Sequence, residues 1–189
     1  MRDMTNLVLT RAALGRETTV ARSAALAVAG SLLIALCAKI QVPMWPVPVT
    51  MQTFAVLLIG LAYGSRLGTA TVALYLAQGA VGLPVFAAGG GIAYLAGPTA
   101  GYLLGYLPAV ALVGWLAERG WSRPAGTVFL AMLLGSAVIY LCGAGWLSVL
   151  VGPEKAVTLG VVPFLLGDVV KAALAAALLP VAWRLLSRF

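Results

Sequence analysis

An aspartate and a lysine lie three residues apart inside a long apolar stretch, in the segment Gly167-Asp168-Val-Val-Lys171. This spacing places both side chains on one face of a helix, where their charges can pair. A charge in hydrocarbon costs about 2.5 to 3.5 kcal/mol, so such residues usually pair with each other or line a cavity. We interpret Asp168 and Lys171 as contacts of a ligand site. The alternative is an ion pair that only joins this helix to its neighbours.

Several kinds of chemistry are excluded by residue type. The sequence has no histidine, and its two cysteines, Cys37 and Cys142, lie in apolar runs. A zinc site or a histidine-based catalytic dyad therefore cannot form. No glycine-rich nucleotide loop of the GxxxxGK[ST] type is present, so another chain must carry any ATP-driven step. We predict neither an enzyme nor a resident metal or cofactor.

The elements that hold these residues are predicted to be membrane-spanning helices. Of the 189 residues 62% are hydrophobic and 9% are charged, and the mean hydropathy is +1.06. A span needs about 20 mostly apolar residues. We therefore predict an all-α membrane protein, a single integral domain over residues 1–189 with a cytoplasmic segment 1–22. Its six helices are expected over about 23–38, 49–63, 68–81, 98–116, 126–147 and 159–186.

The arginines predict the orientation. Basic residues near the ends of spans are retained in the cytoplasm. Nine arginines fall on one side of the predicted topology, whereas only Lys39 and Lys155 fall on the other. Both termini are therefore predicted to be cytoplasmic, in a multi-pass protein of the cell membrane. The net charge of +7 follows from this topology and does not indicate a nucleic-acid partner.

Two uncharged loops on the outer side resemble a lid. Residues 42–48 and 82–97 lack charge but contain the aromatic residues Trp45, Phe86 and Tyr94. Consecutive glycine amides, as at Gly89, Gly90 and Gly91, can form a nest for an anion. The first predicted helix carries small residues at four-residue spacing, namely Ala21, Ala25 and Ala29, which is a pattern that permits close helix approach in lipid.

Four blocks of residues closely resemble the BioY family. They are Pro46-Val-Pro-Val-Thr50-Met-Gln52-Thr-Phe, Gly82-Leu-Pro-Val-Phe86, Gly97-Pro-Thr-Ala-Gly101-Tyr and Gly167-Asp-Val-Val-Lys171. Members of this family are the biotin-specific substrate-binding subunits of energy-coupling factor transporters. The resemblance extends over about residues 25–179 with the blocks in the family's order.

The resemblance implies high-affinity capture of biotin from the outer side by a six-helix subunit. Delivery across the membrane would require a transmembrane coupling protein and cytoplasmic ATPases. By motif position, Asp168 and Lys171 are the expected polar contacts, and the lid loops complete the substrate site. The face with Ala21, Ala25 and Ala29 would dock the coupling subunit. The predicted substrate-binding residues are Asp168, Lys171, Trp45, Gln52, Phe86, Gly89, Gly90, Gly91 and Tyr94.

The chemistry of biotin suits this interpretation. Its ureido ring has two N–H donors and one carbonyl acceptor, and its valerate chain ends in a carboxylate. Asp168 can accept from the ureido N–H groups, and Lys171 can donate to the carbonyl or to the carboxylate. We favour the ureido end for this pair. The candidate anchors for the carboxylate are Lys39, Lys155 and the amides of Gly89 to Gly91.

Two other functions remain open at this point. An ion-coupled or stand-alone secondary transporter of a small vitamin would use Asp168 to carry a proton, but we find no internal repeat of the kind typical of such transporters. A membrane-embedded enzyme has less support, because no nucleophile lies beside a base.

Overall fold

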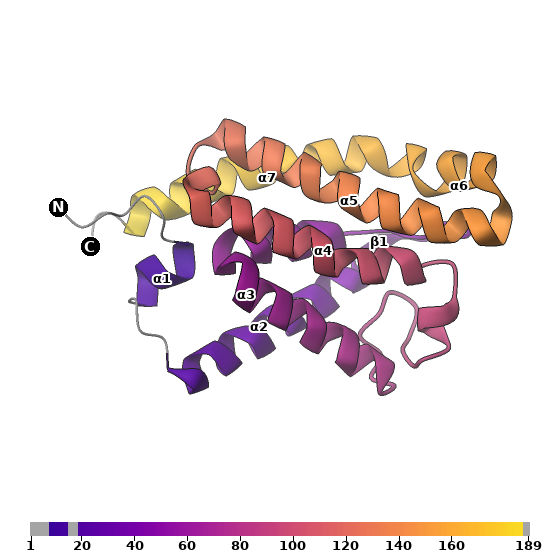
Figure 1. The fold of residues 1–189 in the computed structure, drawn as a ribbon, viewed down its shortest axis with the longest axis horizontal. Coiled ribbons are helices and arrows are strands. Elements are labelled where there is room, and N and C mark those ends of the chain that lie inside the picture. The colour runs from indigo at the N-terminus through magenta and orange to yellow at the C-terminus, as the bar shows by residue number, and fades with distance from the viewer. Residues whose placement is uncertain (1–7, 15–18, 187–189) are drawn as a thin grey trace.

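The computed structural model describes residues 8–14 and 19–186 and is mostly helical within those ranges (Figure 1). A two-stranded antiparallel hairpin and a short 3-10 helix occupy the connections. The helices are α1 (Leu9–Leu14), α2 (Val20–Lys39), α3 (Gln52–Ala80), α4 (Ala100–Leu116), α5 (Ala125–Val151), α6 (Pro153–Gly160) and α7 (Val162–Leu186), and the strands are β1 (Gln41–Val42) and β2 (Val49–Thr50).

Five stretches in the described part of the chain are helical, long and apolar enough to cross a membrane. They are α2, α3, α4 with its continuation to Trp121, α5, and α6 together with α7. Many large apolar side chains on these helices face outward, including Leu36, Leu141 and Leu166. This outward apolar surface is what a helix bundle in lipid requires. The prediction of a mostly helical, membrane-type bundle is therefore confirmed.

The second and third predicted helices form one element, α3, with a sharp break at Gly64. The backbone there has φ 82°, a conformation that glycine adopts without steric cost. The two arms fold back on each other. Gly60 of the first arm and Gly68 of the second are so close that a Cβ placed on Gly68 would lie 3.5 Å from Gly60 Cα. A tight turn between two helices was expected over residues 64–67, and the structure confirms the turn but confines it to Gly64. Glu118 accepts hydrogen bonds from Ser65 N and Oγ at 2.9 and 2.8 Å, which caps the second arm.

Other boundaries also differ from those expected. The first long helix begins at Val20 rather than near residue 23, and the Thr19 hydroxyl accepts a hydrogen bond from Arg22 N at its start. α5 continues to Val151, where Gly152 breaks it with φ 87°. The loop expected over 148–158 instead contains the end of α5 and most of α6, which begins at Pro153, a residue suited to the first helical turn.

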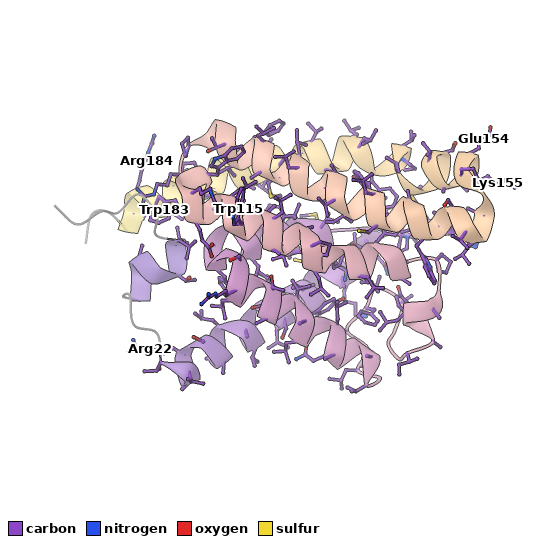
Figure 2. The ribbon with its side chains drawn as sticks, in the orientation of Figure 1. Arg22, Trp115, Glu154, Lys155, Trp183 and Arg184 are labelled. Carbon is purple, nitrogen blue, oxygen red and sulfur yellow. The ribbon has the colours of Figure 1, made fainter. Side chains whose placement is uncertain are left out.

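The two ends of the bundle differ in charge. Figure 2 shows Arg22, Arg184, Trp115 and Trp183 at one end, and Glu154 with Lys155 of α6 at the other. The loop between α3 and α4 lies at the α6 end, whereas α1 and the end of α7 lie at the arginine end (Figure 1). Arg119 stacks on Trp115 at 3.4 Å, and Arg123 stacks on Trp183 at 4.5 Å from the ring centroid.

Candidate substrate-binding site

A mostly apolar cavity lies beneath the hairpin, between α3, α4, α5 and α7. Five aromatic side chains line it, together with a smaller set of polar ones from the hairpin and from the starts of α3 and α4. The aromatic residues are Tyr94, Tyr102, Tyr106, Tyr140 and Phe164, and the polar residues include Thr50, Gln52, Thr53 and Thr99. An apolar pocket with a few convergent polar groups is the usual form of a small-molecule site.

The walls of this cavity lie close together. The space between them amounts to about 500 Å³, but only about 30 Å³ of it admits the centre of a water-sized sphere. The volume of about 500 Å³ is within the range of ligand pockets, whereas the volume of about 30 Å³ leaves room for only a few water molecules. The larger volume includes space that is open to solvent. A ligand larger than a few water molecules therefore requires the lining side chains to move apart.

Asp168 and Lys171 form an ion pair directly behind this wall. Lys171 Nζ lies 2.8 Å from Asp168 Oδ1, and both residues are more than nine-tenths buried. The same Nζ donates to the Thr50 carbonyl at 2.9 Å and to Thr53 Oγ1 at 2.8 Å, so all three of its donors are satisfied. Neither charged side chain is part of the cavity lining, whereas their partners Thr50 and Thr53 are.

The carboxylate of Asp168 has a second partner in the wall. Its Oδ2 accepts a hydrogen bond from the Tyr140 hydroxyl at 2.6 Å, and its Oδ1 accepts one from Thr53 Oγ1 at 3.3 Å. The pair expected from sequence is thus present and fully hydrogen-bonded. It reaches the cavity through Thr53 and Tyr140.

A second polar chain joins the two lid loops. Thr50 Oγ1 donates to Gln52 Oε1 at 3.2 Å, and Gln52 Nε2 donates to the Tyr75 hydroxyl. The Tyr75 hydroxyl in turn donates to the Val85 carbonyl at 3.1 Å, in the loop between α3 and α4. Of the residues predicted from sequence, Gln52 therefore both lines the cavity and connects the hairpin to the other loop.

Phe86 and Tyr94 hold this second loop in place. Phe86 is fully buried, packs edge-on to Tyr75 and stacks on Tyr94 at 5.1 Å between ring centroids. Its ring covers Gly79, where a Cβ would approach to 2.0 Å. Lys39 Nζ donates to the Phe86 carbonyl at 2.8 Å, which ties the end of α2 to the loop. Tyr94 lines the cavity, whereas Phe86 supports it from behind.

The three glycines do not line the cavity. Gly91 N donates to the Gly79 carbonyl at 2.7 Å, and Gly89 N faces the Phe86 carbonyl at 3.4 Å. Gly90 packs against the main chain of Leu83. Two of the amides proposed for an anion nest are thus used within the loop itself. Positive φ angles of 141° at Gly89 and 97° at Gly91 explain the glycines there.

Trp45 lies outside the cavity as well. It is 78% exposed at the tip of the hairpin and borders a surface groove with Glu154 and Lys155 of α6. A different groove runs between the two lid loops, and it shares Pro48, Tyr94 and Thr99 with the cavity. These three residues therefore separate the cavity from the surface.

Comparison with known proteins now identifies the family. The sequence profile of the BioY family matches residues 5–188. The chain belongs to the BioY family. It is 44% identical over 144 residues to the probable biotin transporter BioY of Pyrococcus horikoshii, covering 76% of this chain and 85% of that one. The biotin transporter BioY of Thermotoga maritima is 39% identical over 150 residues, with the same coverage of 76% and 85%.

A solved structure supports the fold. The S-component for biotin from an ECF-type ABC transporter superimposes with a TM-score of 0.73 at 25% identity. The superposition covers 89% of this BioY chain and 94% of the other. Family membership and the five apolar helices together identify a multi-pass membrane protein.

Sequence reasoning missed most of the aromatic wall of this BioY chain. Tyr102 and Tyr106 lie four residues apart and so share one face of α4, a signal that was available in the sequence. Tyr140 is isolated in an apolar helix, and only the fold reveals its contact with Asp168. Phe164 lies between Tyr102 and Tyr140, with ring centroids 6.2 and 6.3 Å away.

The small-residue face of the first long helix is open. Ala21, Ala25 and Ala29 of α2 are exposed, whereas Gly30, Ser31 and Ile34 face inward. A role of this face in docking a partner is consistent with that exposure. Lipid would cover it equally well.

Proposed function

We propose that this protein captures biotin from the outer side of the cell membrane and delivers it across, together with a transmembrane coupling protein and cytoplasmic ATPases. Membership of the BioY family carries the proposal, since relatives of 44% and 39% identity are named biotin transporters. The family is one of transport subunits and not of enzymes. The aromatic cavity under a two-loop lid provides a site of suitable chemistry.

Within this cavity we place the ureido ring against the wall formed by Thr53 and Tyr140. That wall is backed by the Asp168–Lys171 pair, the only buried ion pair among the described residues. The apolar sulfur ring would lie among Tyr94, Tyr102 and Phe164. Burial of the rings removes apolar surface from water, while the polar wall fixes their orientation.

The carboxylate end would then face the lid. Of the candidate anchors, Lys39 is connected to the cavity wall, because its Nζ contacts the carbonyl of Phe86 beside the wall residue Ala87. Lys155 lies on the outer groove with Trp45. We therefore favour Lys39 over Lys155 and the glycine amides as the carboxylate anchor.

We further propose that the two arms of α3 cross the membrane separately. At 1.5 Å per residue, the arms 52–63 and 65–80 are about 18 and 24 Å long, so each can reach across much of a bilayer. Their reversal at Gly64 supports six crossings, with both termini on the cytoplasmic side. The arginine end seen in Figure 2 would face the cytoplasm.

Docking of the coupling protein on Ala21, Ala25 and Ala29 completes the proposal. Small exposed residues at four-residue spacing allow another helix to approach closely.

Uptake of labelled biotin by cells tests the energy source. The chain would be expressed with the coupling protein and ATPases, and also with ATPases inactivated in their nucleotide sites. We expect accumulation of biotin only with active ATPases. Uptake that survives their inactivation but is abolished by a protonophore would instead establish an ion-coupled secondary transporter.

A further inference from the structure

Two residues of the cavity wall, Thr53 and Tyr140, donate a hydroxyl hydrogen bond to the buried Asp168 carboxylate. Tyr140 is the one that lies on α5, away from the lid. Its hydroxyl is 2.6 Å from Asp168 Oδ2, and its ring packs at 6.3 Å from that of Phe164. Both Tyr140 and Phe164 line the cavity, but Asp168 does not. A ligand that approaches Asp168 from this side therefore meets the Tyr140 oxygen first.

The hydroxyl proton of Tyr140 is committed to Asp168. Both oxygens of the Asp168 carboxylate act as acceptors, Oδ1 from Lys171 Nζ at 2.8 Å and Oδ2 from the Tyr140 hydroxyl. An O–H to carboxylate distance of 2.6 Å is typical of a charge-assisted bond. A tyrosine hydroxyl has one proton, and donation to Asp168 uses it. The oxygen consequently presents only lone pairs to the cavity.

The neighbouring hydroxyls differ in what they can still offer. Thr53 Oγ1 already donates to Asp168 and accepts from Lys171, so it is largely occupied. The Tyr102 proton is committed to the Gly160 carbonyl at 2.8 Å, which leaves that oxygen as another acceptor. Thr53 and Tyr140 both donate to the buried carboxylate, and this donation makes their oxygens more negative. Because the Thr53 oxygen also accepts from Lys171, the Tyr140 oxygen is the stronger acceptor left for a ligand.

We propose that Tyr140 determines specificity by accepting a hydrogen bond from a ring N–H of the ligand, with Asp168 acting through it. The inference rests on the proposed function and deepens it. It assigns recognition of one ureido N–H to a tyrosine that no sequence motif indicated. A ligand with an ether or ester oxygen at that position would set two lone pairs against each other and bind more weakly.

The test compares Tyr140→Phe with the unaltered protein. The substitution keeps the ring against Phe164 and removes only the hydroxyl. Tyr63→Phe is the matched control, because the Tyr63 ring of α3 packs against Gly30 of α2 and does not line the cavity. Equilibrium binding of biotin to the purified proteins is measured beside two cyclic carbamate analogues, each with one ureido N–H replaced by oxygen.

We expect Tyr140→Phe to weaken biotin binding by about ten- to a hundredfold, and Tyr63→Phe to change it less than about twofold. The unaltered protein should bind one of the two carbamates at least about tenfold more weakly than biotin, and this discrimination should disappear in Tyr140→Phe. Undiminished biotin affinity in Tyr140→Phe would overturn the inference. So would discrimination that persists in this variant, since Tyr140 would then act only as structural support. If the unaltered protein fails to bind biotin, the proposed function falls and this inference with it.

Discussion

Lys171 of α7 reaches the lid hairpin, since its Nζ lies 2.9 Å from the main-chain oxygen of Thr50 in β2. The same ammonium pairs with Asp168, whose carboxylate holds Tyr140 of α5. One buried charge pair thus connects three elements around the cavity. Binding at the wall and closure of the hairpin are therefore expected to depend on the same two residues.

Removing one charge should be more damaging to folding than removing both. Asp168→Asn leaves Lys171 buried without its partner charge, and we expect biotin affinity about ten- to a hundredfold weaker. The double variant Asp168→Ala, Lys171→Ala removes both charges and should unfold in detergent no earlier than the less stable single alanine variant. It should nevertheless fail to bind biotin. A well-folded double variant with near-normal affinity would show that the pair only joins α7 to the bundle.

The tether from Lys39 to Phe86 should control how long the lid stays closed. Lys39→Met removes the 2.8 Å contact with the Phe86 carbonyl, and a Lys39 anchor for the ligand carboxylate would be lost with it. We expect biotin to dissociate about three- to tenfold faster, with a smaller change in the association rate. Lys39→Arg keeps a cationic donor and should restore slow dissociation. Equal dissociation rates for Lys39→Met and the unaltered protein, followed by stopped-flow fluorescence, would remove Lys39 from the lid.

The contact of Phe86 with Gly79 predicts a steric effect on stability. A methyl group at Gly79 would lie 2.0 Å from the Phe86 ring, so Gly79→Ala must displace the ring or the loop. We expect a loss of about 1 to 3 kcal/mol, measured by thermal unfolding in detergent. Gly126→Ala serves as the control, because nothing lies within 4 Å of its added methyl group. A Gly79→Ala protein as stable as this control would contradict the packing described.

Docking through α2 predicts separate effects on binding and on transport. Ala25→Trp and Ala29→Trp enlarge an exposed face without reaching the cavity, so biotin binding by the isolated chain should survive. Uptake driven by ATP should fall at least about tenfold, since close approach of the partner helix is blocked. Leu141→Trp, on the exposed face of α5, should leave uptake unchanged. Unimpaired uptake in both alanine variants would place the docking surface elsewhere.

Reporter fusions test the proposed topology. Fusions at either terminus should report a cytoplasmic location, and an insertion at Gly90 should report an external one. The reversal of α3 at Gly64 makes this outcome specific, because a single crossing by α3 would place Gly90 and the C-terminus differently relative to the N-terminus. An external C-terminus would exclude the six-crossing arrangement.

Sequence reasoning succeeded where the physical constraint was local. Asp168 and Lys171 could be paired from their spacing alone, because residues three apart on a helix must face the same way. The apolar helices followed from composition for a similar reason. α6 was missed because the segment is short and bears charges, although Pro153 marks its start.

The cavity wall depended on tertiary packing and could not be derived in this way. Asp168 lies 28 residues after Tyr140 in the chain. Nothing near Tyr140 in the sequence indicates that α7 brings this carboxylate to the Tyr140 hydroxyl. Conversely, Trp45 and the Gly89–Gly91 turn have residue types suited to a ligand. The fold uses the glycines for a tight main-chain turn and places Trp45 at the outer tip.

The central claim is capture of biotin in the cavity beneath the lid, and equilibrium binding to the purified full chain tests it most directly. Titration by isothermal calorimetry would be done with biotin, and with the vitamins thiamine and riboflavin as competitors. We predict one biotin bound per chain, unaffected by a hundredfold excess of either competitor, with the affinity reduced in Asp168→Asn. Absence of saturable biotin binding, or equal binding of all three vitamins, would contradict the account.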